Sequence, residues 1–214
     1  MKLISVNVGL PRVVTWKDKT VTTGIFKTAV DGPIELRRHN LDGDKQADLS
    51  VHGGATKAAY VYPLQHYEYW RKELPELDYS WGSFGENFTV DGMDEESVTI
   101  GDEFRIGGAK VVVTEPRMPC FKLGIRFGRA DMVKRFLSSQ RTGFYFGVVE
   151  EGQVEAGDEL ELLNKHPDQL SVADVTRLYS TEQTNDKLLK KAISVLALPQ
   201  SWRGYFEHQL DKLY

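Results

Sequence analysis

The single cysteine of the chain, Cys120, lies in a segment that favours thiolate chemistry. Pro116 and Pro119 precede it, and proline fixes its own φ and restricts the residue before it. We therefore expect a rigid, non-helical turn that presents the thiol in one direction. Arg117 and Lys122 lie nearby, and positive charge favours the thiolate, which is a nucleophile and a ligand for soft metals. Free cysteines are more often small buried hydrophobes, so that alternative stays open.

A glycine pair, Gly53 and Gly54, lies between His52 and Lys57. Glycines let backbone N–H groups approach an anion closely, and Lys57 adds a point charge, so the cluster predicts an anion cradle. A tight turn explains such a pair equally well. The P-loop and dinucleotide-binding glycine patterns are absent, so neither ATP nor NAD is expected here. Asp48 and His52 could form a hydrogen-bonded pair, which spacing alone does not establish.

Two further groups of polar residues are weaker candidates. Asn87 lies among glycines in the segment 81–88, which indicates either a loop aimed at a ligand or a turn with a positive φ at Asn87. Lys27, together with Arg37 and Arg38, adds cations to the first third of the chain, where a solvated face is the commoner explanation.

The elements that must hold these residues are mostly short strands. Up to about residue 165, apolar stretches are bounded by Gly, Asp, Asn and Pro, a pattern typical of a barrel. These stretches are 3–8, 21–26, 59–62, 98–106, 111–114, 144–149 and 160–163. Two helices are expected among them, one between Pro63 and Pro75 and one near 129–139, with their aromatic and Met residues in the core.

After His166 and Pro167 the pattern changes to helical periodicity. Ser171 begins a capping-box sequence, a second helix ends before Pro199, and Ser201 is the expected N-cap of a third. Roughly 50 residues are marginal as a lone domain, so this tail should pack on the barrel or on a second subunit, which makes a homodimer plausible. We divide the chain into residues 1–165 and 166–214.

Composition excludes several classes of protein. The 214 residues include 27 Lys and Arg, 31 Asp and Glu, and one Cys, with a formal net charge of −4. One cysteine permits neither an internal disulfide nor a cysteine-based zinc site, so a reducing, cytoplasmic setting is expected. No apolar run approaches the roughly 20 residues of a membrane helix, and no signal peptide is evident. The charge argues against nucleic-acid binding but allows a small basic pocket.

Four short motifs, taken in order, resemble the MOSC domain, the module named for the C-terminal part of molybdenum-cofactor sulfurase, in its YiiM-like branch. They span residues 48–62, 84–87, 115–123 and 143–145, and the helical tail with its Leu-Pro-x-Ser-Trp sequence is similar to the small α-domain of this branch. Thr56 departs from the pattern, because an acidic residue is common there. The resemblance implies a mainly β fold with α: a MOSC-type β-barrel with peripheral helices and a three-helix C-terminal domain.

The resemblance also implies a bound molybdenum cofactor (molybdopterin), with Cys120 as the protein thiolate on molybdenum. The expected activity is reduction of N-hydroxylated compounds, such as hydroxylaminopurines, to amines, which would detoxify these base analogues. The chain has no flavin or nicotinamide fingerprint, so electrons are expected from a separate flavoprotein reductase. Pyridoxal phosphate is not expected.

Roles for the other candidates follow from this resemblance. A cofactor ending in phosphate needs a cationic pocket lined by N–H groups, and an amide suits the edge of a pterin ring. His52 is the preferred proton donor, with Asp48 as its orienter. The cofactor-binding candidates are Lys27, Gly53, Gly54, Lys57, Asn87, Arg117 and Lys122.

Two other functions fit the same residues. Cys120 could carry a persulfide in a sulfur-transfer protein, or the chain could be a non-catalytic module that binds the cofactor and docks a partner through its helical tail. Every thiolate-based interpretation depends on Cys120, because the chain has no second cysteine.

Overall fold

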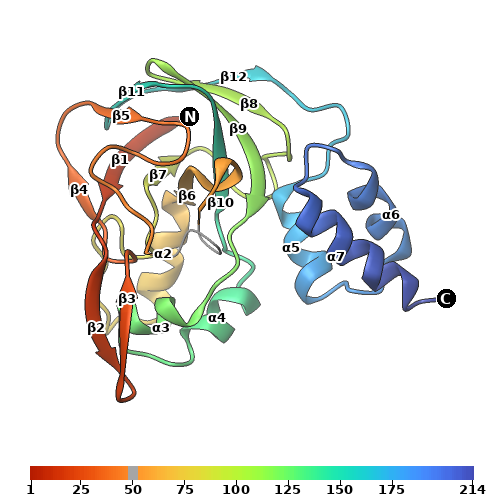
Figure 1. Cartoon of the computed structure of the whole chain (residues 1–214), viewed down its shortest axis with the longest axis horizontal. Helices are drawn as coiled ribbons and strands as arrows, with labels where there is room; N and C mark the ends of the chain where they lie inside the picture. Colours follow the sequence, from red (N-terminus) through yellow and green to blue (C-terminus); the bar gives the residue numbers. More distant parts are fainter. Residues whose placement is uncertain (48–52) are drawn as a thin grey trace.

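The computed structural model describes residues 1–47 and 53–214. Strands dominate up to residue 164, and the last three helices form a separate group beside them (Figure 1). The strands are β1 (Lys2–Val8), β2 (Arg12–Trp16), β3 (Lys19–Thr23), β4 (Thr28–Val30), β5 (Ile34–Leu36), β6 (Ala59–Pro63), β7 (Phe88–Asp91), β8 (Glu103–Ile106), β9 (Ala109–Pro116), β10 (Phe144–Glu150), β11 (Gly152–Val154) and β12 (Leu160–Asn164). The helices are the 3-10 helix η1 (Ala55–Lys57), α2 (Leu64–Glu73), α3 (Phe121–Phe127), α4 (Met132–Ser138), α5 (Val172–Ser180), α6 (Asp186–Ser194) and α7 (Gln200–Asp211).

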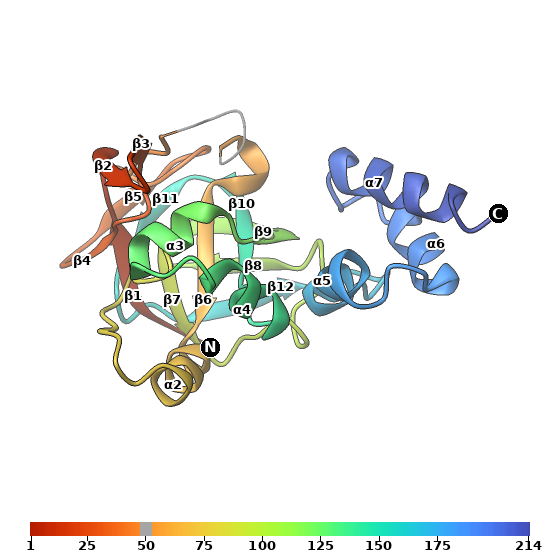
Figure 2. The same cartoon turned by 90° about the horizontal axis from the view of Figure 1, so that it is seen from below.

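One large sheet contains eight strands in the order β12-β8-β9-β10-β6-β7-β1-β4. The expected closed barrel is not confirmed. Closure needs a ladder between the two edge strands, and the edges here, β12 and the three-residue β4, do not pair within the described chain. One isolated bridge, between Lys2 and Glu159, links β1 to the start of β12. The fold is therefore mixed α/β with a large open sheet (Figure 2).

The main core runs from the sheet into the C-terminal helices. In β9, Val111 and Val113 are buried while Lys110 and Val112 are partly exposed, as expected when alternate side chains face opposite sides of a sheet. Val175 of α5 belongs to the same buried cluster. The strand-rich part and the helical tail thus share one core.

A second cluster is rich in aromatic rings and lies between α2 and α4. The rings of Trp70 and Phe136 stack with centroids 5.9 Å apart, and the Trp70 indole donates a hydrogen bond of 2.7 Å to the Tyr62 hydroxyl. The core role predicted for both helices is confirmed, because Trp70, Met132 and Phe136 are almost fully buried. Two of its members, Ile25 and Tyr60, also line the pocket described below.

Three predicted element boundaries are wrong. Helix α3 begins at Phe121, inside the expected turn, because Pro119 restricts the residue before it rather than those after it. Helix α7 begins directly after Pro199, so Ser201 lies within the helix and is not its N-cap. The strand expected over 98–106 is shortened to β8, because Gly101, with φ of 92°, turns the chain.

The helical tail begins with the predicted capping box. The Ser171 hydroxyl accepts from the backbone N–H of Asp174 at 3.0 Å, and the Asp174 carboxylate accepts from the backbone N–H of Ser171 at 3.1 Å. The backbone N–H of Ala173 donates to the Glu95 carbonyl at 2.8 Å. The tail therefore packs on the strand-rich part, which is one of the two arrangements expected from the sequence. None of the helices in the described part of the chain is long and apolar enough to cross a membrane.

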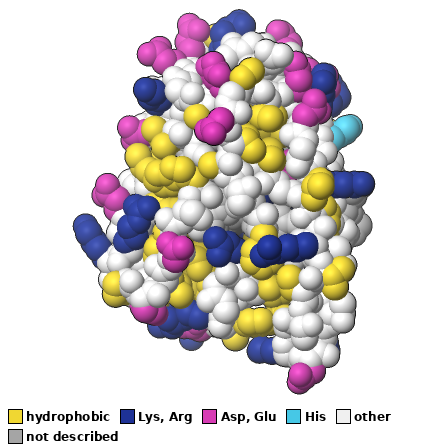
Figure 3. Space-filling view, turned by 90° about the vertical axis from the view of Figure 1, so that its left-hand side faces the viewer, with side chains coloured by type: hydrophobic (Ala, Val, Ile, Leu, Met, Phe, Trp, Pro, Cys, Tyr) yellow, Lys and Arg dark blue, Asp and Glu magenta, His cyan; other side chains and the backbone are white. Residues whose placement is uncertain are grey.

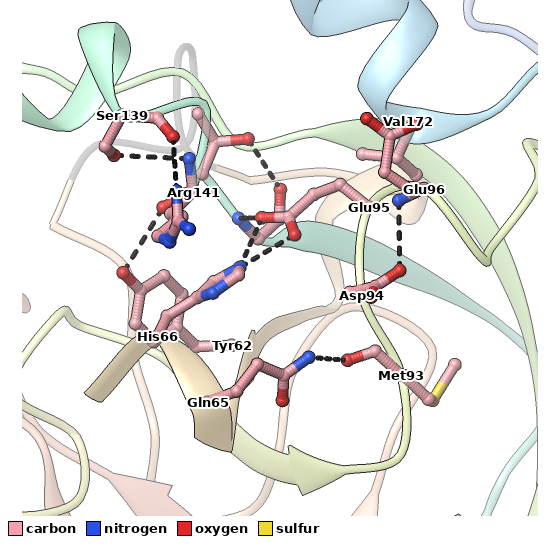
Figure 4. Close-up of polar contacts among 12 residues, drawn as sticks. Tyr62, Gln65, His66, Met93, Asp94, Glu95, Glu96, Ser139, Arg141 and Val172 are labelled. Atoms are coloured by element: carbon pink, nitrogen blue, oxygen red, sulfur yellow. Dashed lines mark hydrogen bonds and ion pairs between the residues drawn. The ribbon is translucent and has the colours of Figure 1, made fainter. Parts of the chain in front are cut away.

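A buried His–Glu pair reinforces this junction (Figure 4). Nε2 of His66, in α2, lies 2.7 Å from Oε2 of Glu95, and both side chains are buried. Oε1 of Glu95 also accepts from the backbone N–H of Gly143 at 2.6 Å. Glu95 thus connects α2, the start of β10 and, through its carbonyl, the beginning of α5.

Candidate functional site

A pocket opens where segments that are distant in sequence meet, with an empty volume of about 600 Å³ including its mouth. Its walls come from the end of β3, the loop that leads to residue 47, η1, β6, the loop before β7, the turn after β9, and β10. Most of the candidate residues line it: Lys27, Lys57, Asn87, Arg117, Cys120 and Lys122.

Cys120 occupies the position directly before α3, with extended backbone angles φ −124° and ψ 171°. The residue is partly exposed and lines the pocket. Arg117 and Lys122, its neighbours in sequence, line the same pocket. The thiol is therefore placed beside cations at a cavity wall, unlike a cysteine that only fills the core.

Arg117 is a buried cation. Its guanidinium carbon lies 5.2 Å from the ring centroids of both Tyr60 and Phe136, and its Nη1 atom has no hydrogen-bond partner in the described chain. Burial alone would lower the pKa of Arg117, but Tyr60, Tyr145 and Cys120 favour the cation, and the pKa is raised. A buried guanidinium with an unused donor on a pocket wall is suited to binding an anion.

Lysines add to the positive charge of the lining. The Lys57 ammonium lies 3.8 Å from a carboxylate oxygen of Glu115. Lys27 forms a buried ion pair with Asp44, and burial lowers the pKa of Lys27 although Asp44 opposes the shift. The charges of Lys27 and Lys57 are thus both matched in part by carboxylates of the protein.

The side chain of Asn87 is largely engaged by the protein. Its Nδ2 donates to the Asn7 carbonyl at 3.2 Å and to Asp44 at 3.0 Å, and its Oδ1 accepts from the backbone N–H of Tyr60 at 3.0 Å. Both amide hydrogens are used within the protein, so the Asn87 side chain holds the pocket wall in place. The left-handed residues of this loop are Gly82 and Gly85, with φ of 84° and 81°, and not Asn87.

The glycine pair does not join the pocket. Gly54 precedes η1 with φ of 101°, a conformation that favours glycine, but neither Gly53 nor Gly54 belongs to the pocket lining. The structure therefore does not bring the expected glycine cradle to Cys120. Asp48 and His52 lie outside the described residues.

The lining residues that the sequence does not single out as candidates include Asp44, Tyr60 and Tyr145. Burial raises the pKa of Tyr145 to about 12, so its hydroxyl keeps its proton near neutral pH. The sequence could have identified Tyr60 and Tyr145, because both belong to the motifs that carry the family resemblance. No feature of the sequence identifies Asp44, because its contacts with Lys27 and Asn87 form only in the folded chain.

The charge of the molecule is unevenly distributed. On the face that carries the β2–β3 hairpin, Lys and Arg side chains form a band across the middle, while acidic side chains lie mainly above it (Figure 3). This band occurs on a chain whose formal net charge is −4. An anionic ligand that reaches this face meets locally positive charge.

Residues 48–161 match the family model described as the MOSC domain, which is more than half of the chain. The chain belongs to the MOSC domain family. Residues 170–213 of this MOSC protein match a second model, described as the YiiM-like, 3-alpha helix domain, and they contain α5, α6 and α7. The resemblance expected from the four motifs and the tail is confirmed.

Relatives of this MOSC protein include whole-length matches. "Uncharacterized protein YflK" of Bacillus subtilis is 41% identical over 99% of this chain and 95% of the relative. A protein named "Reductase" from Gibberella moniliformis is 36% identical over 79% of this chain, which covers 30% of that longer protein. The crystal structure of YiiM from Geobacillus stearothermophilus superposes with a TM-score of 0.82 at 33% identity, covering 98% of each chain.

Proposed function

We propose that this MOSC protein is a molybdenum-cofactor-dependent reductase that converts N-hydroxylated compounds, such as hydroxylaminopurines, to amines. The observation that carries the proposal is the pocket in which the lone thiol, Cys120, lies beside the buried and incompletely hydrogen-bonded guanidinium of Arg117. A soft thiolate and an unused cationic donor are what a phosphate-bearing metal cofactor requires of its protein.

The residues present fit that cofactor. Cys120 would bind the metal, and Arg117, Lys57 and Lys122 would bind its phosphate and other anionic groups. When bound, the cofactor supplies two-electron redox chemistry at the metal, which the side chains of this chain do not provide. The protein contributes binding, orientation and charge.

Protons for the amine product must come from the protein or from water. We assign proton delivery to His52, oriented by Asp48, since the ordinary pKa of histidine lies near neutrality. Tyr145 keeps its proton at neutral pH, with a pKa of about 12, and can donate a hydrogen bond to an oxygen of the ligand. Replacing His52 by Gln should reduce turnover and leave bound molybdenum unchanged. Equal loss of both would make His52 a binding residue.

Electrons must come from outside the chain, and we propose a flavoprotein reductase as their source. The fungal relative named "Reductase" is much longer than this chain, which supports a partnership between a unit of this kind and further protein. A redox role is also in keeping with a pocket lined by one partly exposed cysteine.

Metal analysis of protein from molybdate-replete cells tests the proposal. We expect about one molybdenum per chain in the wild type and none in Cys120→Ser, together with consumption of a hydroxylaminopurine when a chemical electron donor is added. A cyanide-labile sulfur on Cys120 without molybdenum would establish the sulfur carrier instead. Holo-protein that does not consume the substrate would refute the reductase and leave a cofactor-binding module.

A further inference from the structure

Two arginines from segments far apart in the sequence lie against one aromatic ring, that of Phe26. The guanidinium carbon of Arg12, in β2, lies 3.4 Å from the ring centroid, and that of Arg126, in α3, lies 5.9 Å from it. Neither arginine forms an ion pair with a carboxylate in the described part of the chain. Two like charges therefore meet at one ring without a carboxylate partner among the described residues.

Arg126 is the less solvated of the two. Its Nη2 donates to the Ser83 hydroxyl at 3.0 Å, and its buried Nε has no hydrogen-bond partner within residues 1–47 and 53–214. Burial lowers the pKa of Arg126; Tyr67 and Glu86 oppose this shift, and the charge of Arg12 adds to it. An external anion stabilises a cation in such a position, because it replaces lost solvation and offsets the repulsion between the like charges.

The arginines extend a set of cations that begins at the pocket. Lys122 and Arg126 are four residues apart in α3 and therefore lie on the same face of that helix. Lys122 lines the pocket, and so does Lys45, whose backbone N–H donates at 3.2 Å to the carbonyl of Gly9, three residues before Arg12. Positive charge thus extends from the pocket to the β2–β3 hairpin, on whose face the Lys and Arg band lies (Figure 3).

Exposed apolar side chains accompany these cations. Phe121, the first residue of α3, is 53% exposed, and Leu10, two residues before Arg12, is 66% exposed. Aromatic residues and arginine are enriched in protein interfaces. Small interfaces that are guided by complementary charge are typical of electron-transfer partners. We call the surface formed by Leu10, Arg12, Phe26, Phe121 and Arg126 the arginine surface.

We propose that the arginine surface is the docking site for an acidic flavoprotein that supplies electrons to the pocket. The inference rests on the proposed function in taking a separate flavoprotein as the electron source. Because α3 begins directly after Cys120, a partner on this surface lies next to the pocket. The small extent of the surface, on a chain with a formal net charge of −4, suits an acidic protein better than nucleic acid or a membrane.

The electrons and protons of the reaction balance in this arrangement. The reduced flavin of the partner gives up two electrons and is oxidised, and it releases two protons to solvent. In the pocket, R–NHOH takes up two electrons and two protons, the N–O bond breaks, and the products are R–NH2 and water.

Calorimetric titration of the full chain with a flavodoxin, a small acidic flavoprotein, tests the proposal. We expect Arg12→Gln to weaken flavodoxin binding about 10-fold, because it removes an exposed charge from the interface, and added Arg126→Gln to weaken it further. The matched control, Lys187→Gln with Lys212→Gln, removes two exposed cations from the helical tail and should bind like the wild type. Unchanged binding by Arg12→Gln, or no binding of flavodoxin by the wild type, overturns the proposal.

Salt separates an electrostatic role of Arg12 from damage to packing. Raising the salt from about 50 mM to about 500 mM should weaken binding by the wild type and remove most of its advantage over Arg12→Gln, because salt screens exposed charges. A difference that persists in full at high salt would show a packing effect, and the proposal would be wrong. Phosphatidylglycerol vesicles serve in a parallel titration: Arg12-dependent binding of vesicles without binding of flavodoxin would identify a membrane contact instead.

Molybdenum content and turnover with a chemical electron donor distinguish this inference from the proposed function. Wild type that binds flavodoxin in the Arg12-dependent manner but contains no molybdenum refutes the reductase and supports the docking site. Holo-protein that consumes a hydroxylaminopurine with the chemical donor but does not bind flavodoxin refutes the docking site alone. In holo-protein, Arg12→Gln should raise the flavodoxin concentration for half-maximal rate about 10-fold and leave the rate with the chemical donor unchanged. An equal loss with both donors would overturn the docking role.

Discussion

The guanidinium of Arg117 lies over the ring of Tyr60, with 5.2 Å between the guanidinium carbon and the ring centroid. Aromatic faces attract a cation without neutralising it. A carboxylate in the place of Tyr60 would form an ion pair with Arg117 and occupy its donors. The rings of Tyr60 and Phe136 thus hold the buried positive charge of Arg117 in the pocket and leave it available to a ligand.

Replacing Arg117 by Met should remove cofactor binding and spare the fold. We expect molybdenum per chain to fall at least about 10-fold. The free energy of unfolding should stay within about 1 kcal/mol of the wild type or rise, because an apolar side chain replaces a buried charge. Metal analysis and urea denaturation measure the two effects. Arg117→Lys, which keeps the charge, is the control, and a large loss of stability in Arg117→Met would identify a structural residue instead.

Stability should show a pH dependence that comes from Glu86. Burial raises the pKa of this carboxyl above its ordinary value of 4.5. Between pH 4.5 and the folded-state pKa the folded protein therefore binds the proton more readily than the unfolded chain. The contribution of Glu86 to the unfolding free energy is fully present below pH 4.5 and falls as pH rises through the folded-state pKa.

Glu86→Gln removes this contribution but places an amide where the backbone N–H groups of Gly82 and Phe84 need an acceptor. The variant should lose about 1–3 kcal/mol of stability. Denaturation of both proteins from about pH 4.5 to about pH 7 should show the advantage of the wild type shrinking as pH rises. A growing advantage would contradict the raised pKa.

Adjacent glutamates should respond differently to truncation. Glu95→Ala leaves His66 and the backbone N–H of Gly143 without their acceptor inside the protein (Figure 4), which should cost about 3 kcal/mol. Glu96 pairs with Arg177 at 2.6 Å, but its side chain is 68% exposed, so Glu96→Ala should cost less than about 1 kcal/mol. Urea denaturation compares them, and equal losses would contradict the structural role of Glu95.

Two left-handed glycines offer a similar matched pair. Gly143 and Gly128 have φ of 67° and 65°. A Cβ at Gly143 would lie 2.3 Å from the Val61 carbonyl oxygen, whereas one at Gly128 would meet nothing within 4 Å. Gly128→Ala should cost about 1 kcal/mol, from the backbone conformation alone, and Gly143→Ala about 2–4 kcal/mol. If thermal unfolding showed the same loss of stability in Gly143→Ala and Gly128→Ala, the predicted crowding at Gly143 would be wrong.

Gly143→Ala should also weaken cofactor retention. The Gly143 carbonyl accepts from the backbone N–H of Arg117 at 3.1 Å, so displacement of β10 moves the pocket cation. Molybdenum content should fall in this variant and stay unchanged in Gly128→Ala. Full retention in both would show that the site tolerates movement of β10.

Local patterns were reliable guides to local structure. Helix α2 between two prolines, the capping box at Ser171 and the strands β1, β6, β9 and β10 follow from residue spacing and from conformational limits that act within a few residues. The start of α3 at Phe121 was not predicted, because a turn and a short helix can follow one another within the few residues around two closely spaced prolines.

Long-range relationships had to come from the folded molecule. Whether the sheet closes depends on the pairing of its edge strands, and β12 and β4 do not pair in the described part of the chain. The neutralisation of Lys27 depends on Asp44, and the buried carboxylate of Glu115 receives a hydrogen bond from the indole of Trp202, 87 positions further along the chain. Burial and long-range hydrogen bonds arise only when such distant segments meet, whereas the identity of the single thiol of the chain, Cys120, was already plain from the residues themselves.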